Sequence, residues 1–191
     1  MRRAIAAVIC AVTLSACDSS RPKKPHVPAQ IEKKAAAMQS LGDPVNFEAL
    51  QAFLPSNDFI VKDGWQKSDM TGMLLSVPMK GSQASLTLKK SGAQMVVNIT
   101  DTVFNQSLYA PVAAFLADGF STSDADGYKK SVTMQGFPAF EERSIPKRAA
   151  GVTVLVGRRF LVHVQGTGVD GTDAVKTIAG QINMARLAEL K

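Results

Sequence analysis

The chain has 191 residues, two cysteines and a formal net charge of +6 at pH 7, and 46% of its residues are hydrophobic. This length allows one domain of ordinary size with a hydrophobic core of its own. The basic residues are scattered rather than gathered into a stripe with aromatic neighbours, which argues against nucleic-acid binding. Both cysteines lie within the first 17 residues, so cysteine catalysis and cysteine-ligated zinc are excluded for the rest of the chain.

The first 17 residues combine a basic start, a short apolar run and small residues before a cysteine. Arg2 and Arg3 precede the run Ala4–Leu14, and this is the layout of a secretory signal. The run is shorter than the roughly 20 apolar residues of a transmembrane helix. The sequence Leu14-Ser15-Ala16-Cys17 resembles the lipobox of bacterial lipoproteins.

The lipobox resemblance implies cleavage between Ala16 and Cys17 and transfer of a diacylglyceryl group to the Cys17 thiol. The mature chain would keep 175 residues and a charge of about +4, because the two arginines leave with the signal. Asp18 directly after the lipidated cysteine implies retention in the inner membrane, with the outer membrane as the alternative. Conventional cleavage of a secreted protein is the other interpretation, but it would leave Cys17 as an unexplained free thiol.

Residues 17–44 form the predicted tether. Pro22, Pro25 and Pro28 lie among basic residues, a composition typical of an extended spacer. Its lysine and arginine side chains are expected to be solvated, although they could also bind anionic lipid head groups. The alanine- and lysine-rich stretch Ala29–Leu41 predicts a short helix that ends before Gly42.

The folded domain is predicted to span residues 45–191 and to begin with a helical turn or two over Asn46–Phe53. Strand-like sequence starts at Ile60. Alternation of apolar and polar residues predicts two successive hairpins between residues 72 and 103. Their parts are the apolar run Met73–Met79, the alternating run Ala84–Lys89, the turn Lys90-Ser91-Gly92 and the strand Gln94–Val103.

The middle of the domain changes to helical spacing over Ala110–Phe120, with Pro111 in the first turn. A polar loop is expected over residues 121–127. Two strands follow, Lys129–Met134 and Phe137–Ile145, with a turn at Gln135-Gly136 between them.

Two β-rich runs, Val152–Val156 and Phe160–Val164, flank a predicted tight turn at Gly157-Arg158. This register places Val152, Val154, Leu161 and His163 on one face, and Leu155, Phe160, Val162 and Val164 on the other. Both faces are then largely apolar, which predicts a central hairpin covered by helices on both sides. The last elements are a helix from Thr172 or Asp173 through Ile182 and a final turn over Asn183–Leu190.

The predicted fold is therefore α+β: an antiparallel β-sheet with helices packed on both faces. The order of elements, the sequence Gly136-Phe137-Pro138-Ala139 and the hairpin Thr153–Val164 resemble the PsbP-like fold. That resemblance implies a non-catalytic binding or assembly role, as an analogy between folds.

Two short patterns resemble a cofactor-binding and a calcium-binding motif, but each is explained better as a turn or a connection. The segment 166–171 matches G-x-G-x-x-G, yet the chain has no following parallel strand and no suitably placed acid to grip a ribose. Asp124-x-Asp126-Gly127 resembles part of a calcium loop, but Thr133 occupies the position of the bidentate glutamate. No cofactor and no metal are expected.

The remaining candidates are single residues. His163 is the only histidine of the predicted domain and has no evident triad or metal partners. Glu141 and Glu142 are neighbours in a strand, so their side chains are expected on opposite faces. Arg158 and Arg159 at the hairpin tip are candidates for contact with a partner or with head groups, against a default role as solubilising charge.

Taken together, these patterns predict a lipid-anchored, non-catalytic protein of the bacterial cell envelope. It would lie at the periplasmic face of the inner membrane and bind or help assemble another envelope component. The alternative is a periplasmic carrier or sensor with an apolar pocket between sheet and helix.

Overall fold

The computed structural model describes residues 42–75 and 80–191. The predicted signal, the helix expected at Ala29–Leu41 and the predicted sites at Ala16, Cys17 and Asp18 lie outside the described residues. Within the described part, every helix is too short or too polar to cross a membrane.

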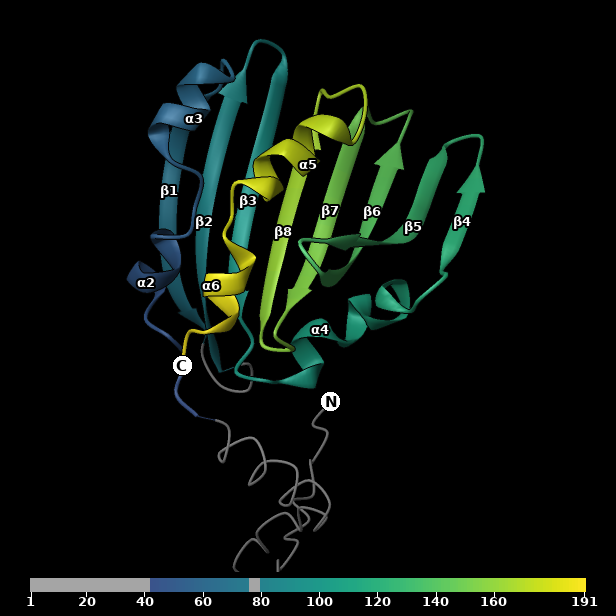
Figure 1. Cartoon of the computed structure of the whole chain (residues 1–191). Coiled ribbons are helices and arrows are strands. Elements are labelled where there is room, and N and C mark those ends of the chain that lie inside the picture. Colours follow the sequence, from purple (N-terminus) through teal and green to yellow (C-terminus); the bar gives the residue numbers. More distant parts are fainter. Residues whose placement is uncertain (1–41, 76–79) are drawn as a thin grey trace, which may run out of the picture.

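The domain is built on one eight-stranded antiparallel sheet in the order β1-β2-β3-β8-β7-β6-β5-β4 (Figure 1). Two meanders, β1–β3 and β4–β8, join in the middle because β3 pairs with β8. The strands are β1 (Gln66–Leu75), β2 (Gly81–Lys90), β3 (Ala93–Asp101), β4 (Ser121–Asp124), β5 (Gly127–Met134), β6 (Phe137–Ser144), β7 (Ala149–Val156) and β8 (Phe160–Thr167).

The helices are short, and four of them lie over one face of the sheet (Figure 1). They are α2 (Phe47–Gln51), α3 (Asn57–Lys62), α5 (Asp173–Gly180) and α6 (Met184–Ala188). α4 (Gln106–Ala113) and the 3-10 helix η1 (Ala114–Leu116) connect β3 to β4 across one end of the sheet. The Asn183 side chain caps α6 by accepting a hydrogen bond from the Arg186 amide at 3.0 Å.

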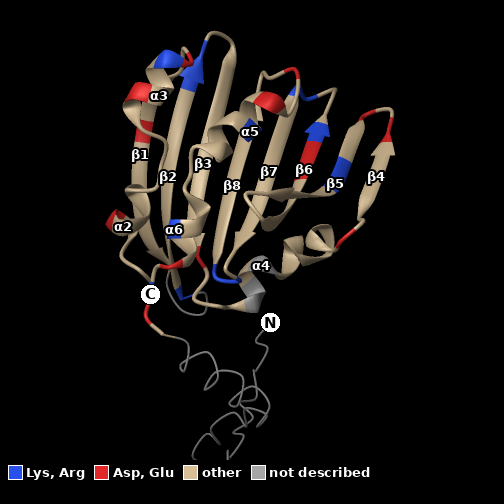
Figure 2. Cartoon of the chain, in the orientation of Figure 1, with Lys and Arg blue, Asp and Glu red and all other residues tan. Residues whose placement is uncertain are grey.

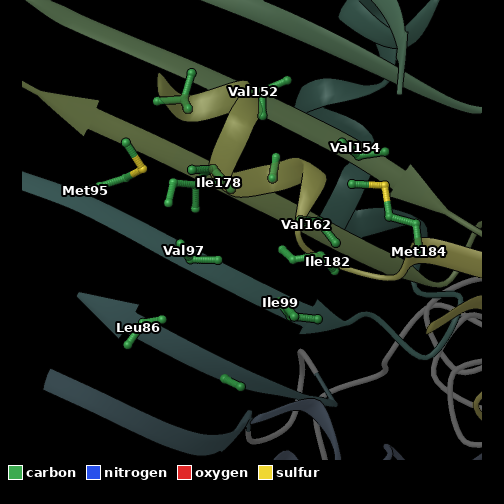
Figure 3. Close-up of a cluster of buried hydrophobic side chains, with 14 of the residues drawn as sticks. Leu86, Met95, Val97, Ile99, Val152, Val154, Val162, Ile178, Ile182 and Met184 are labelled. Carbon is green, nitrogen blue, oxygen red and sulfur yellow. The ribbon is translucent and has the colours of Figure 1, made fainter. Parts of the chain in front are cut away.

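The hydrophobic core fills the space between these four helices and the sheet. Every second residue of the central strands points into it, as the period of a β-strand requires. The buried residues of α5 follow helical spacing, so one stripe of that helix faces the strands. Figure 3 shows the contributors Leu86, Met95, Val97, Ile99, Val152, Val154, Val162, Ile178, Ile182 and Met184.

The second face of the sheet has no comparable helical layer in the described residues. Its side chains on β2, β3 and β8 are mostly polar, and η1 reaches one corner, where Phe115 packs on Phe140 with ring centroids 5.2 Å apart. The prediction of helices packed on both faces is therefore wrong. The structure is a large antiparallel sheet with one helix-covered face and one open face.

The cause of this error is a one-residue difference in the β7–β8 hairpin. Val156 pairs with Phe160, so the loop has three residues, Gly157, Arg158 and Arg159, rather than the two of a tight turn. A slip of one residue moves every side chain of a strand to the other face. The predicted grouping of Val152 and Val154 with Leu161 and His163 is thus wrong. The core valines are Val152, Val154, Val162 and Val164, whereas Thr153, Leu155, Leu161 and His163 belong to the open face.

Other predicted elements differ less. The two hairpins between residues 72 and 103 are confirmed as β1–β3, although residues 76–79 of the first run lie outside the described residues. Ile60 lies in α3 rather than in a strand, because Ser56 caps a helix there. The helix predicted from Ala110 begins at Gln106, and the expected loop at 121–127 contains the short edge strand β4.

Candidate functional site

The described chain begins beside one end of the sheet, which is called the proximal end below. Four residues from neighbouring strands form a row across it: Leu74 pairs with Ser82, Ser82 with Asp101, and Asp101 with Phe160. Lys80 precedes this row and forms an ion pair with Asp43 at 2.7 Å. The proximal end therefore gathers the start of the domain, the end of β3 and the β7–β8 loop.

Asp101 is a fully buried carboxylate at this end. One of its oxygens accepts hydrogen bonds from the Val45 amide at 2.8 Å and the Arg159 Nη2 at 2.8 Å. The other accepts from the Val103 amide at 2.8 Å and the Arg159 Nε at 2.9 Å. Burial of a charge is costly unless it is paired and hydrogen-bonded, and here both oxygens are saturated.

Arg159 connects the same cluster to its surroundings. The Arg159 side chain is only 11% exposed. Its guanidinium donates to the Asp43 carbonyl at 3.3 Å and lies over the rings of Phe104 and Phe160, at 5.6 and 5.2 Å from their centroids. Arg158, the other predicted contact residue, is exposed. At the hairpin tip, Arg158 is thus exposed to a partner, whereas Arg159 holds the start of the domain against β3.

The loop that leaves Asp101 has an unusual backbone. Val103 and Phe104 have φ angles of +48° and +58°, values that side chains larger than glycine rarely adopt and that cost free energy. The loop is held by Thr102, whose amide and hydroxyl both donate to the Arg159 carbonyl, at 2.9 and 2.6 Å. This strained but well hydrogen-bonded loop leaves Phe104 50% exposed.

A second candidate is an open hollow of about 380 Å³ on the uncovered face, over β4–β8. It is lined mainly by polar and charged residues, among them Lys129, Glu142, Lys147 and Gln165. Lys129 and Glu142 form an ion pair at 2.8 Å. The hollow differs from the apolar pocket between sheet and helix that a carrier of apolar ligands was expected to have.

His163 lies on the open face, where its Nδ1 is 2.7 Å from the Thr153 hydroxyl. Burial lowers the pKa of His163, against opposing contributions from the charge of Glu142 and a hydrogen bond with Gln165. The structure thus places the histidine beside the hollow. Among the described residues, no three histidine, cysteine or acidic side chains cluster in a way that would hold a metal ion.

Glu141 and Glu142 point to opposite faces, as predicted, and only Glu141 is buried. The Glu141 carboxylate receives Lys130 Nζ at 2.9 Å, the Tyr128 hydroxyl at 3.1 Å and, from α5, Lys176 Nζ at 3.4 Å. Burial alone would raise the pKa of Glu141, but the hydrogen bonds from Lys130 and Tyr128 and the charge of Lys176 hold it below its ordinary value. Glu141 thereby fastens α5 to β5 and β6.

Glu141→Gln is expected to lower the free energy of unfolding by about 2 kcal/mol at pH 7, because charged hydrogen bonds in a covered site are lost. The folded pKa lies below the ordinary 4.5, so the unfolded chain takes up the proton first and stability falls as pH drops below 4.5. The variant should lack this part of the acid dependence, measured by urea unfolding between pH 3 and 7. Glu142→Gln, which breaks the more exposed pair, is the control, and an equal effect of both changes would contradict the assignment.

The G-x-G-x-x-G segment has a packing role in this structure. A side chain at Gly166 would meet Val169 and Val175, and one at Gly168 would come within 2.2 Å of the Gly92 carbonyl oxygen, at a φ of +72°. These glycines let the end of β8 pass close to α5 and to the β2–β3 turn. A shallow hollow nearby is lined by Trp65, Lys90 and the segment 168–171.

Asp124 ends β4 in a surface turn. Its Oδ1 accepts hydrogen bonds from the amides of Asp126 at 2.9 Å and Gly127 at 3.0 Å. A carboxylate engaged with its own turn explains the Asp-x-Asp-Gly sequence without calcium.

The sequence patterns missed the site that the structure builds best, the Asp101–Arg159 pair and the loop beside it. One signal was present: Asp101 continues the inward-facing series Met95, Val97 and Ile99, so its carboxylate had to enter the core and find a partner.

Comparison with models of known protein families and with curated proteins finds no match to this chain. The functional argument therefore depends on the residues themselves.

Proposed function

We propose that this protein is a lipid-anchored, non-catalytic component of the bacterial cell envelope whose sheet domain binds or helps assemble another envelope component. The anchor is the acylated Cys17, and the domain lies at the periplasmic face of the inner membrane. Asp18 is the residue that retains it there.

The observation that carries this proposal is the sequence Leu14-Ser15-Ala16-Cys17 at the end of a short apolar run with a basic start. A secretory signal of that layout ends in small residues, and a cysteine directly after them is the acceptor in bacterial lipoproteins. Two or three acyl chains hold a protein stably, at about 0.8 kcal/mol for each buried CH₂ group.

Two features of the domain support a binding role. The open face presents polar side chains over several adjacent strands, such as Gln83, Thr87 and Asn98, together with the hollow beside Gln165. The domain is fastened at the end where the chain from the anchor arrives, through the Val45 amide and the Asp43 carbonyl. An anchored module with an exposed face suits a scaffold or accessory protein.

The decisive experiment is metabolic labelling with an alkyne fatty acid in a Gram-negative host. The wild-type chain should take up label and fractionate with inner membranes, whereas Cys17→Ala should lose the label and keep an uncleaved N-terminus. Cys10→Ala is the matched control, because Cys10 lies in the predicted signal and its loss should leave labelling unchanged.

Absence of label from the wild-type protein, or a soluble protein with a free Cys17 thiol, would refute the anchor. Recovery of the labelled protein in outer membranes would keep the anchor and refute the role assigned to Asp18.

A further inference from the structure

The proximal end combines exposed apolar side chains with basic ones. Phe104 is 50% exposed and Leu74 is 61% exposed. Figure 2 shows basic and acidic positions together at this end of the sheet. Arg158 of the β7–β8 loop is exposed, whereas Lys80 is paired with the exposed Asp43. Aromatic and aliphatic groups flanked by cations are the composition that binds the interface of an anionic bilayer.

We infer that the proximal end is a second membrane contact, through which the domain lies against an anionic phospholipid surface with Phe104 and Leu74 in the head-group region. The inference rests on the proposed lipid anchor. It adds that the domain has a fixed orientation on the bilayer, with α3 and the β2–β3 turn pointing away from it.

The position of the chain's first described residues selects a lipid surface as the occupant. The segment from Asp18 to Leu41 has 24 residues, which span roughly 80 Å at most when fully extended. The described chain begins at Gly42, at the end of the sheet that α4 crosses (Figure 1). An anchor at Cys17 therefore joins the domain at this end rather than at the opposite one.

The backbone around Phe104 gives a second reason. Two consecutive residues with positive φ are costly, and the surrounding hydrogen bonds from Thr102 and to Asp101 keep the loop in place. The result is an exposed aromatic ring stacked on a buried guanidinium. Asparagine would fit this backbone better; phenylalanine instead places a ring over the guanidinium and leaves half of the residue exposed.

The test uses the full-length, lipidated protein in vesicles of phosphatidylcholine and phosphatidylglycerol (7:3). Phe104→Cys, Leu74→Cys and Val61→Cys are each labelled with an environment-sensitive dye. Val61 is the matched control, because it is an exposed apolar residue on α3, at the other end of the sheet. Iodide quenching should fall about threefold at positions 104 and 74 on the vesicles and stay unchanged at position 61.

Two further arms separate the alternatives. Phe104→Asn suits the positive φ but removes the ring over Arg159, so urea unfolding is measured to show that the variant is folded. On the vesicles it should restore iodide quenching of the dye at position 74. With pure phosphatidylcholine the protection should weaken, since the basic residues lose their partners.

Equal quenching at positions 104 and 61 on lipidated, vesicle-bound protein would overturn the inference and leave the anchor intact. Protection that arises in native membranes but not in lipid vesicles would also overturn it, in favour of a protein partner. Failure of the anchor itself gives a different signal: the protein without an introduced cysteine would take up dye at Cys17.

Discussion

Replacing Arg159 with methionine is expected to lower the free energy of unfolding by about 3–5 kcal/mol, the cost of leaving one partner of a buried ion pair alone. Asp101 is fully buried and accepts two hydrogen bonds from this guanidinium. Methionine can fill the space but cannot neutralise the carboxylate. Urea unfolding at pH 7 measures the effect.

The matched control for this prediction is Arg158→Met, which removes an exposed arginine from the same loop and should change stability by less than about 0.5 kcal/mol. The double variant Asp101→Asn/Arg159→Met should be less destabilised than the sum of the single changes, because the uncompensated charge is gone. Additive effects, or a loss of unfolding free energy below about 1 kcal/mol for Arg159→Met, would show that the Asp101–Arg159 pair does not stabilise the domain as the structure indicates.

Gly168→Ala is expected to lower the free energy of unfolding by about as much as Arg159→Met. A left-handed backbone costs roughly 1–2 kcal/mol for a residue with a side chain, and the added carbon would lie 2.2 Å from the Gly92 carbonyl oxygen. Displacing that backbone adds roughly 1–3 kcal/mol. The midpoint of urea unfolding should therefore move to a lower urea concentration than in the wild type.

Gly171→Ala tests the same glycine-rich segment without the clash, because no atom lies within 4 Å of the position an added carbon would take. It should unfold like the wild type. If both changes were equally harmless, the packing explanation for the G-x-G-x-x-G sequence would fail.

The sequence predicted the local elements better than their assembly. Alternation identified β2 and β3 because the inward residues Leu86, Leu88, Met95 and Val97 are apolar and the outward residues are mostly polar. It missed β4, whose four residues are all exposed at the sheet edge and so carry no contrast between two faces.

The larger error came from the length of one loop. Assigning two residues rather than three to the turn after Val156 exchanged the faces of β8, and an amphipathic hairpin then looked apolar on both sides. Arg159, predicted at the hairpin tip as a candidate for partner contact, is the third loop residue and turns inward to Asp101. Loop length depends on this contact between residues far apart in sequence, which periodicity does not detect.

The central position of β8 also has a consequence for how the chain folds. The last strand in the sequence closes the sheet, pairing Ile99 with Val162 across a long intervening segment, and loop closure of that kind slows folding. Until β8 arrives, β3 keeps an unpaired edge of the sort that recruits other chains. A chain emerging N-terminus first would therefore stay vulnerable to misassembly until almost all of it had been released.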